Sequence, residues 1–169
     1  MVLSVERKAT EAKSRLVHLS LLTLNLRLME NWRSVPIVMR GAALDYETTM
    51  ILMAIIVIGA EKLLRIELEP ELQTLTQRLS QNRFGKVNFS SIAAATAINR
   101  ETVRRKVNDL QEAGVVVREK EGIRIAHGVI QFEVLREIID AQLDALTRTV
   151  NQLSRLGVLL ANSNHSLNG

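Results

Sequence analysis

The chain contains no cysteine among its 169 residues. A disulfide framework, a thiolate-bound metal and a cysteine nucleophile are therefore excluded. The absence is compatible with a reducing compartment, and we expect a cytoplasmic protein. Histidine is scarce as well, because His18, His127 and His165 stand far apart, without the spacing that a zinc site needs. We expect neither a metal ion nor a cofactor.

Aromatic residues make up only 3% of the chain, although 47% of it is hydrophobic, so the expected core is aliphatic. The longest apolar run, residues 50–60, is too short to cross a bilayer, which needs about 20 residues. A phosphate-binding glycine-rich loop and a GxSxG motif are both missing. The sequence therefore predicts neither a membrane-spanning protein nor an enzyme.

Positive charge is in small excess, with 22 Lys and Arg against 18 Asp and Glu, a net charge of +4. An excess of this size does not identify a nucleic-acid-binding protein, because the position of the charge matters more. Four of the basic residues lie within residues 100–106. The segment around them is the most informative part of the chain.

Residues 90–116, SSIAAATAINRETVRRKVNDLQEAGVV, predict a short helix, a tight turn at residues 97–99 and a second helix. Asn99 is a favourable N-cap for the second helix, and Gly114 stands where a helix prefers its C′ glycine. Val103, Val107 and Leu110 form one inward stripe, which turns the basic residues outward. The alternative to a binding surface is a solvated helix face. A second helix with a basic outer face, placed after a small-residue turn, favours insertion into the DNA major groove.

Residues 92–105, IAAATAINRETVRR, resemble the DNA-binding helices of bacterial MarR-type and GntR-type regulators. Those families usually have glycine where this chain has Ala97, and often serine where it has Asn99. Residues 115–126, VVVREKEGIRIA, are similar to the wing of such proteins, with a turn at Glu121 and Gly122 between two strands. The resemblance implies a winged helix-turn-helix fold and, often, a repressor that a small ligand releases. The sequence itself identifies no such effector.

On this hypothesis the DNA contacts fall into two groups. Arginine binds guanine and glutamate accepts from cytosine in the major groove, whereas the basic side chains of the wing hold phosphates. The expected DNA-binding residues are Asn99, Arg100, Glu101, Thr102, Arg104, Arg105, Asn108, Arg118, Lys120 and Arg124. We expect Arg100, Glu101, Arg104 and Arg105 to enter the major groove, and Asn99, Thr102 and the three wing residues to contact phosphates.

Both ends of the chain carry long apolar seams. Residues 5–32 are predicted to form one helix, with a heptad row from Val5 to Leu26, and residues 129–160 a second, with a row from Leu135 to Leu160. One small domain cannot cover so much apolar surface, so we expect a homodimer through the terminal helices. The polar residues 161–169 are expected to be a frayed tail.

The segment between the first helix and the turn predicts two more helices. Asp45 is expected to cap a helix that runs to about residue 65, and residues 69–80 to form the next helix. The apolar run at residues 50–60 has two interpretations: a helix buried on all sides, or a methionine-rich lining of an effector pocket.

The sequence thus predicts a mainly α fold with a small β-hairpin wing. Residues 1–44 form an N-terminal dimerisation helix and linker, 45–128 the winged helix-turn-helix domain, and 129–169 the C-terminal dimerisation helix and tail. The expected function is a dimeric regulator that binds double-stranded DNA sequence-specifically and acts as a repressor. The alternative is a helical scaffold that uses its winged helix for protein docking, which Glu112, Glu119 and Glu121 favour because they dilute the positive charge.

Overall fold

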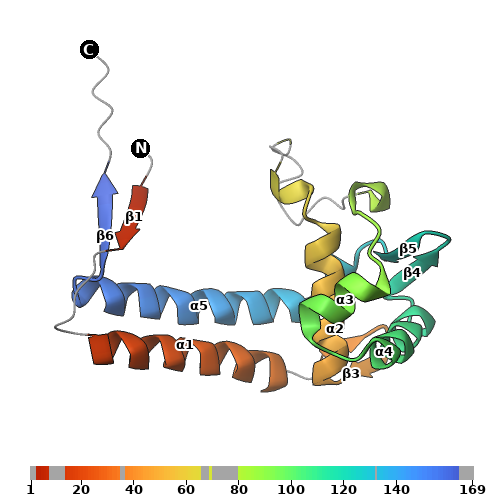
Figure 1. Ribbon diagram of the computed structural model, residues 1–169, viewed down its shortest axis with the longest axis horizontal. Helices are drawn as coiled ribbons and strands as arrows, with labels where there is room; N and C mark the ends of the chain where they lie inside the picture. The colour runs from red at the N-terminus through yellow and green to blue at the C-terminus, as the bar shows by residue number, and fades with distance from the viewer. Residues whose placement is uncertain are drawn as a thin grey trace, which may run out of the picture. The chain divides into compact units, whose positions relative to one another are not determined.

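The computed structural model describes residues 3–7, 14–34, 37–65, 69, 80–131 and 133–163 (Figure 1). The chain divides into two compact units, residues 1–34 with 138–169, and residues 35–137. The protein is mainly helical, with small antiparallel sheets of two strands each, so the coarse fold class is confirmed. Among the described helices, none has the length and apolar character needed to span a membrane.

The first unit joins the two ends of the chain. It contains the strand β1 (Leu3–Arg7), the helix α1 (Ser14–Ser34), most of the helix α5 (Glu133–Arg155) and the strand β6 (Leu159–Ser163). The two strands pair antiparallel, with Leu3 opposite Ser163 and Arg7 opposite Leu159. The two helices run antiparallel to each other within this unit (Figure 1).

The prediction of uninterrupted terminal helices was wrong at both ends. Residues 3–7 are a strand, and α5 ends before Gly157, which has a φ of 73°. Val158 N–H donates to Leu153 O across this end at 3.0 Å, the capping pattern of a left-handed C′ glycine. A heptad row can be read through both places, but a glycine at C′ and the pairing of distant strands override that periodicity. The predicted frayed tail was wrong for residues 161–163, which belong to the paired strand β6.

The second unit contains the remaining elements, in chain order. They are β2 (Ile37–Met39), β3 (Ala42–Leu44), α2 (Tyr46–Gly59), the short 3-10 helices Leu63–Arg65 and Gln81–Arg83, α3 (Phe89–Thr96), α4 (Arg100–Glu112), β4 (Val116–Glu119), β5 (Gly122–Ile125) and a 3-10 turn at Val129–Gln131. The beginning of α5 also belongs to this unit.

The β2–β3 hairpin is a feature that the sequence reasoning missed. Ile37 and Met39 are buried and Val38 between them is exposed, the alternation of a half-buried strand. Arg40 and Gly41 connect the strands with φ angles of 50° and 84°, as in a type I′ turn. Strands of three residues are too short for periodicity to identify.

The helix α2 begins as predicted, because the Asp45 side chain accepts a hydrogen bond from Thr48 N–H at 2.8 Å. It ends at Gly59 instead of near residue 65. The interpretation of a helix buried on all sides was wrong, since Ile51, Leu52 and Ile55 are buried but Val57 is 60% exposed. The helix predicted over residues 69–80 lies outside the described residues, apart from its two end positions.

The turn between α3 and α4 contains a strained residue. Ala97 has φ 55° and ψ 19°, the left-handed conformation, which costs a residue with a Cβ about 1–2 kcal/mol. Since glycine also loses more chain entropy on folding, we expect Ala97→Gly to raise the free energy of unfolding by about 0.5–1 kcal/mol. Chemical denaturation measures this change.

Ala94→Gly is the matched control, because Ala94 is exposed within the right-handed helix α3. There the same replacement should lower the free energy of unfolding by up to about 1 kcal/mol. If both variants were destabilised equally, the left-handed turn at residue 97 would be contradicted.

Candidate functional site

The helix α4 separates its side chains into a buried stripe and an exposed face, as predicted. Val103, Val107 and Leu110 are fully buried. The side chains on the other side are exposed, namely those of Arg100, Glu101, Arg104, Arg105 and Asn108, while Thr102 is half-buried. The buried stripe therefore fixes which side chains α4 presents to solvent.

Both ends of α4 are fixed by local hydrogen bonds. The Asn99 side chain accepts from Glu101 N–H at 2.8 Å, which confirms the predicted N-cap. At the other end Gly114 has a φ of 67°, and Val115 N–H donates to Leu110 O at 2.9 Å. These bonds close a Schellman motif and confirm the predicted glycine stop. Local hydrogen bonds therefore fix both the first and the last turn of α4.

A side-chain ion pair ties α4 to the N-terminus of α2. The Lys106 ammonium donates to one carboxylate oxygen of Asp45, whose other oxygen accepts from the backbone and the hydroxyl of Thr48. Burial alone would raise the pKa of Asp45, but the hydrogen bonds from Lys106 and Thr48 outweigh it and lower the pKa to about 2. Lys106 is therefore engaged in holding α4, and the basic face of α4 consists of its three arginines.

Arg40 adds a positive group at the far end of the same helix. A Cβ built on Gly114 would lie only 2.7 Å from Arg40 Nη1, so the guanidinium sits against the C-terminal turn of α4. Positive charge is favoured there by the helix dipole. The sequence reasoning missed Arg40 because the β2–β3 hairpin that carries it was not predicted.

The β4–β5 hairpin follows α4 directly. Val116 pairs with Ile125 and Glu119 with Gly122, so Lys120 and Glu121 form the loop, one residue earlier than predicted. Val87 extends the hairpin on the β5 side, since it exchanges two backbone hydrogen bonds of 2.8 Å with Ile123. The buried side chains of both strands anchor the hairpin, and its loop projects with exposed side chains.

The acidic residues of the hairpin are paired with cations. Lys86 Nζ lies 3.1 Å from Glu119 and 3.0 Å from Glu121. The hydrogen bonds to Glu121 and Glu119 raise the pKa of Lys86, and the bond from Lys86 lowers the pKa of Glu121. Arg124 lies 3.4 Å from Glu119 and donates to Asn82 Oδ1 at 3.1 Å. Its side chain is only 12% exposed, so Arg124 is part of the hairpin's own support.

Two basic side chains of the hairpin, Arg118 and Lys120, are exposed. The Arg118 guanidinium lies 5.3 Å from the centroid of the Phe89 ring at the start of α3, a cation–π contact that holds it in place. Within the described part of the chain, no acidic side chain pairs with Arg100, Arg105 or Lys120. Arg104 has only a distant partner, with its Nε 3.9 Å from Glu101.

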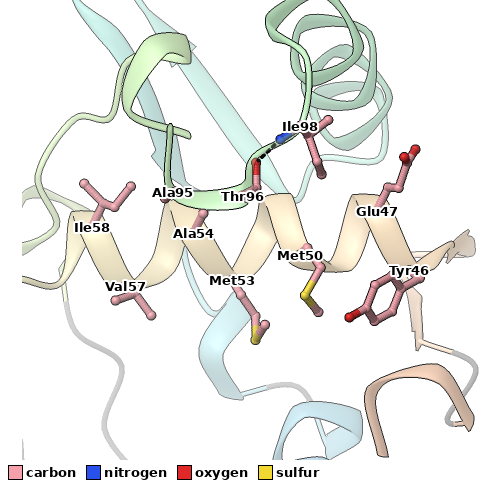
Figure 2. Close-up of a pocket in the computed structure, with 10 residues that line it drawn as sticks. All are labelled: Tyr46, Glu47, Met50, Met53, Ala54, Val57, Ile58, Ala95, Thr96 and Ile98. Atoms are coloured by element: carbon pink, nitrogen blue, oxygen red, sulfur yellow. Dashed lines mark hydrogen bonds between the residues drawn. The ribbon is translucent and has the colours of Figure 1, made fainter. Parts of the chain in front are cut away.

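An apolar groove of about 640 Å³ lies beside the turn between α3 and α4. Figure 2 shows Met50, Met53 and Val57 projecting from one side of α2, with Thr96 and Ile98 at the turn. The Thr96 hydroxyl is occupied, because it accepts from Ile98 N–H at 3.3 Å. The groove therefore offers an aliphatic, methionine-rich lining with few polar groups, and its volume is that of a small-molecule site.

Among the described residues, no cluster of three or more His, Asp or Glu side chains is arranged to hold a metal ion. Comparisons of the chain with protein-family models, with curated proteins and with solved structures give no match.

Proposed function

We propose that the second unit is a winged helix-turn-helix that binds double-stranded DNA, and that the protein is a transcriptional regulator acting as a repressor. The observation that carries this proposal is the exposed face of α4. Three arginines stand on a helix that is capped at both ends and fixed to α2 by Lys106. In this assignment α3 is the supporting helix, α4 enters the major groove and the β4–β5 hairpin is the wing.

The proposed base contacts come from the outer face of α4. Arg104 and Arg105 donate to guanine, and Glu101 accepts from cytosine N4, once Arg104 swings away from its weak partner. Asn108 lies on the same exposed face. Because the Asn99 oxygen caps α4, only the amide NH₂ group of Asn99 is available to a phosphate. Arg100 and Thr102 stand beside it, at the N-terminus of α4, where anions are favoured.

The wing assignment predicts a change in salt dependence. Replacing Arg118 and Lys120 by alanine should weaken the binding of all DNA sequences about equally, because phosphate contacts carry no sequence information. The slope of log affinity against log salt concentration should become flatter by about one unit for each lost contact. Fluorescence anisotropy over a salt series, with a specific and a random duplex, measures both effects.

Arg124→Ala is the matched control on the same hairpin. Since Arg124 pairs with Glu119 and Asn82, its loss should lower the stability of the hairpin and leave the salt slope nearly unchanged. The earlier expectation that Arg124 contacts phosphate is thus replaced by a supporting role. A salt slope that changed in Arg124→Ala but not in Arg118→Ala would contradict the proposed wing.

The direct test of the proposed function is selection of bound fragments from a sheared genomic library that includes the gene's own upstream region. A sequence-specific regulator should bind some fragment at least about 10³-fold more tightly than a random duplex at physiological salt. A correctly folded protein that binds every fragment equally weakly would exclude sequence-specific recognition. In a two-fold dimer, two copies of α4 would meet successive major grooves about 34 Å apart.

The second candidate is a protein-docking module, and the groove of α2 is the observation that favours it. Tyr46, Met50, Met53 and Val57 follow each other at steps of four, three and four, a spacing that suits an amphipathic helix. An adaptor of this kind would lose its partner in Val57→Asp and keep it when Arg104 and Arg105 are replaced. The opposite pattern is expected for DNA binding.

A further inference from the structure

The first unit has little interior of its own. Its two helices and one two-stranded sheet leave only a few side chains buried, and several of these are small or polar. The buried described residues of this unit are Ser20, Ile138, Ala145, Thr149, Leu153 and Val158. A two-stranded sheet is marginal by itself, and a helix needs another layer for each apolar face. More apolar surface must therefore be covered than this unit covers within one chain.

One uncovered surface is a stripe along α1. Leu19, Leu22, Leu26 and Met29 follow each other at steps of three, four and three, and each is between 50% and 64% exposed. Ser20, on nearly the opposite side of α1, is buried, and its hydroxyl donates to Leu16 O. The heptad spacing of the row is that of a helix–helix seam. We call these four residues the α1 stripe.

A second uncovered surface lies along α5. Ile139, Leu143 and Leu146 follow at steps of four and three, and each is between 46% and 59% exposed. The neighbouring positions Ala145 and Thr149 are buried. The three exposed residues, which we call the α5 stripe, therefore stand beside the buried face of α5 and extend it outward. Together the two stripes exceed the isolated apolar residues that a monomer normally exposes.

We propose that a second copy of this chain covers both stripes, with the α1 stripe of one copy packed on the α5 stripe of the other. The charges favour this occupant. The helix α1 contains three arginines and one glutamate. The part of α5 that carries the α5 stripe, residues 139–146, contains Asp140 and Asp144 and no basic residue, with Arg136 and Arg148 flanking it. A surface that places a basic helix next to a short acidic segment is complementary to itself under a two-fold axis. An unrelated partner would have to reproduce both the apolar spacing and the charge pattern.

The resulting dimer refines the sequence-based hypothesis of terminal seams. The residues in contact are the middle of α1 and the part of α5 from Ile139 to Leu146, while the ends of the predicted rows have other roles. Val5 and Leu160 belong to the paired strands β1 and β6, and Leu153 is buried within one chain. The dimer surface lies entirely in the first unit, so it shares no residue with the face of α4 proposed for DNA binding.

Light scattering on the full chain tests this dimer. The wild type is expected at twice 18.9 kDa at micromolar concentration. Leu22→Asp and Leu146→Asp place an unpaired charge in the seam and should raise the dimer dissociation constant by about 100-fold or more. Asn151→Asp adds the same charge at an exposed polar position of α5, away from the α5 stripe, and should leave the dimer intact. A wild-type monomer, or equal effects of all three variants, would overturn the proposal.

Cross-linking provides a measurement that does not depend on the folding of the aspartate variants. Because the chain has no cysteine, a chain with Leu26→Cys can be mixed with a chain with Leu146→Cys and treated with a short bismaleimide. The mixture should give a covalent dimer, and the Leu26→Cys and Asn151→Cys pair should give much less, because Asn151 lies away from the α5 stripe. A dimer by light scattering without the mixed cross-link would place the interface elsewhere and overturn the proposed pairing. A monomer that adsorbs to lipid vesicles instead would show a lipid surface as the occupant.

Discussion

Replacing Arg104 and Arg105 together by alanine is expected to reduce the affinity for a specific DNA duplex by about 30-fold or more. Each lost bidentate contact to a base costs about 1–3 kcal/mol, and a tenfold change in affinity corresponds to about 1.4 kcal/mol. Neither side chain supports the fold, because both are exposed opposite the buried stripe of Val103, Val107 and Leu110. Anisotropy at fixed salt concentration, with the best duplex from the genomic selection, measures the loss.

Gln111→Ala is the control for this double replacement. Gln111 is exposed on the same helix but belongs to its last turn, beyond the arginines. Its side chain should contribute little to DNA binding, so the affinity of Gln111→Ala for the specific duplex is expected to stay within about twofold of the wild type. Arg105→Lys is informative as well, because lysine keeps the charge but loses the bidentate geometry. It should bind random DNA nearly as well as the wild type and the specific duplex less well. Full specific affinity in the double variant would reject α4 as the recognition helix.

The features of α4 that sequence reasoning predicted are those that depend on neighbouring residues. Asn99 caps the helix through the amide of Glu101, two positions away, and Gly114 ends it through bonds that span one turn. The inward stripe follows from the helical period alone. Such interactions are encoded within a few residues, which is why the caps, the turn and the outward face could be read from the sequence.

The ion pairs of the site could not be predicted, because they join distant positions. Lys106 meets Asp45, and Arg124 meets Asn82, only through the folding of the whole unit. In the sequence, Arg124 and Arg118 look alike, as two arginines in neighbouring strands. The structure separates them, since Arg118 is exposed over Phe89 and Arg124 is enclosed. Side chains of one type therefore differ in availability for reasons that local pattern cannot show.

The predictions for the two terminal segments were wrong for a different physical reason. A heptad row indicates only which residues would share one face of a helix. It does not show where the helix begins or ends, because any apolar residue at the right spacing continues the row. The partner of residues 3–7 is the strand at the opposite end of the chain, which no local pattern indicates. For α2, the uniformly apolar run could not reveal that Val57 would be exposed, because burial depends on which elements the fold places beside it. Long-range pairing and the choice of neighbours were thus the missing information.

Leu110→Ala is expected to lower the free energy of unfolding of the second unit by about 2–5 kcal/mol. Leu110 is fully buried, and removal of its side-chain atoms loses their transfer free energy and leaves a cavity behind. Its carbonyl accepts from Val115 N–H, a backbone bond that alanine keeps, so the expected loss comes from the side chain alone. Tyr46 is the only tyrosine and lies in the same unit, so its fluorescence in a denaturant series reports the transition.

Val38→Ala provides the comparison, since it removes aliphatic atoms from a side chain that is already 54% exposed and should cost less than about 1 kcal/mol.

The core variant and the arginine variant also separate an effect on stability from an effect on DNA recognition. Leu110→Ala should weaken DNA binding only as far as the folded fraction falls, so stabilising conditions should restore it. The double replacement of Arg104 and Arg105 should stay weak under every condition that keeps the unit folded. If Leu110→Ala cost no more than Val38→Ala, Leu110 would not occupy a packed interior, and the face of α4 proposed for DNA would have to be reassigned.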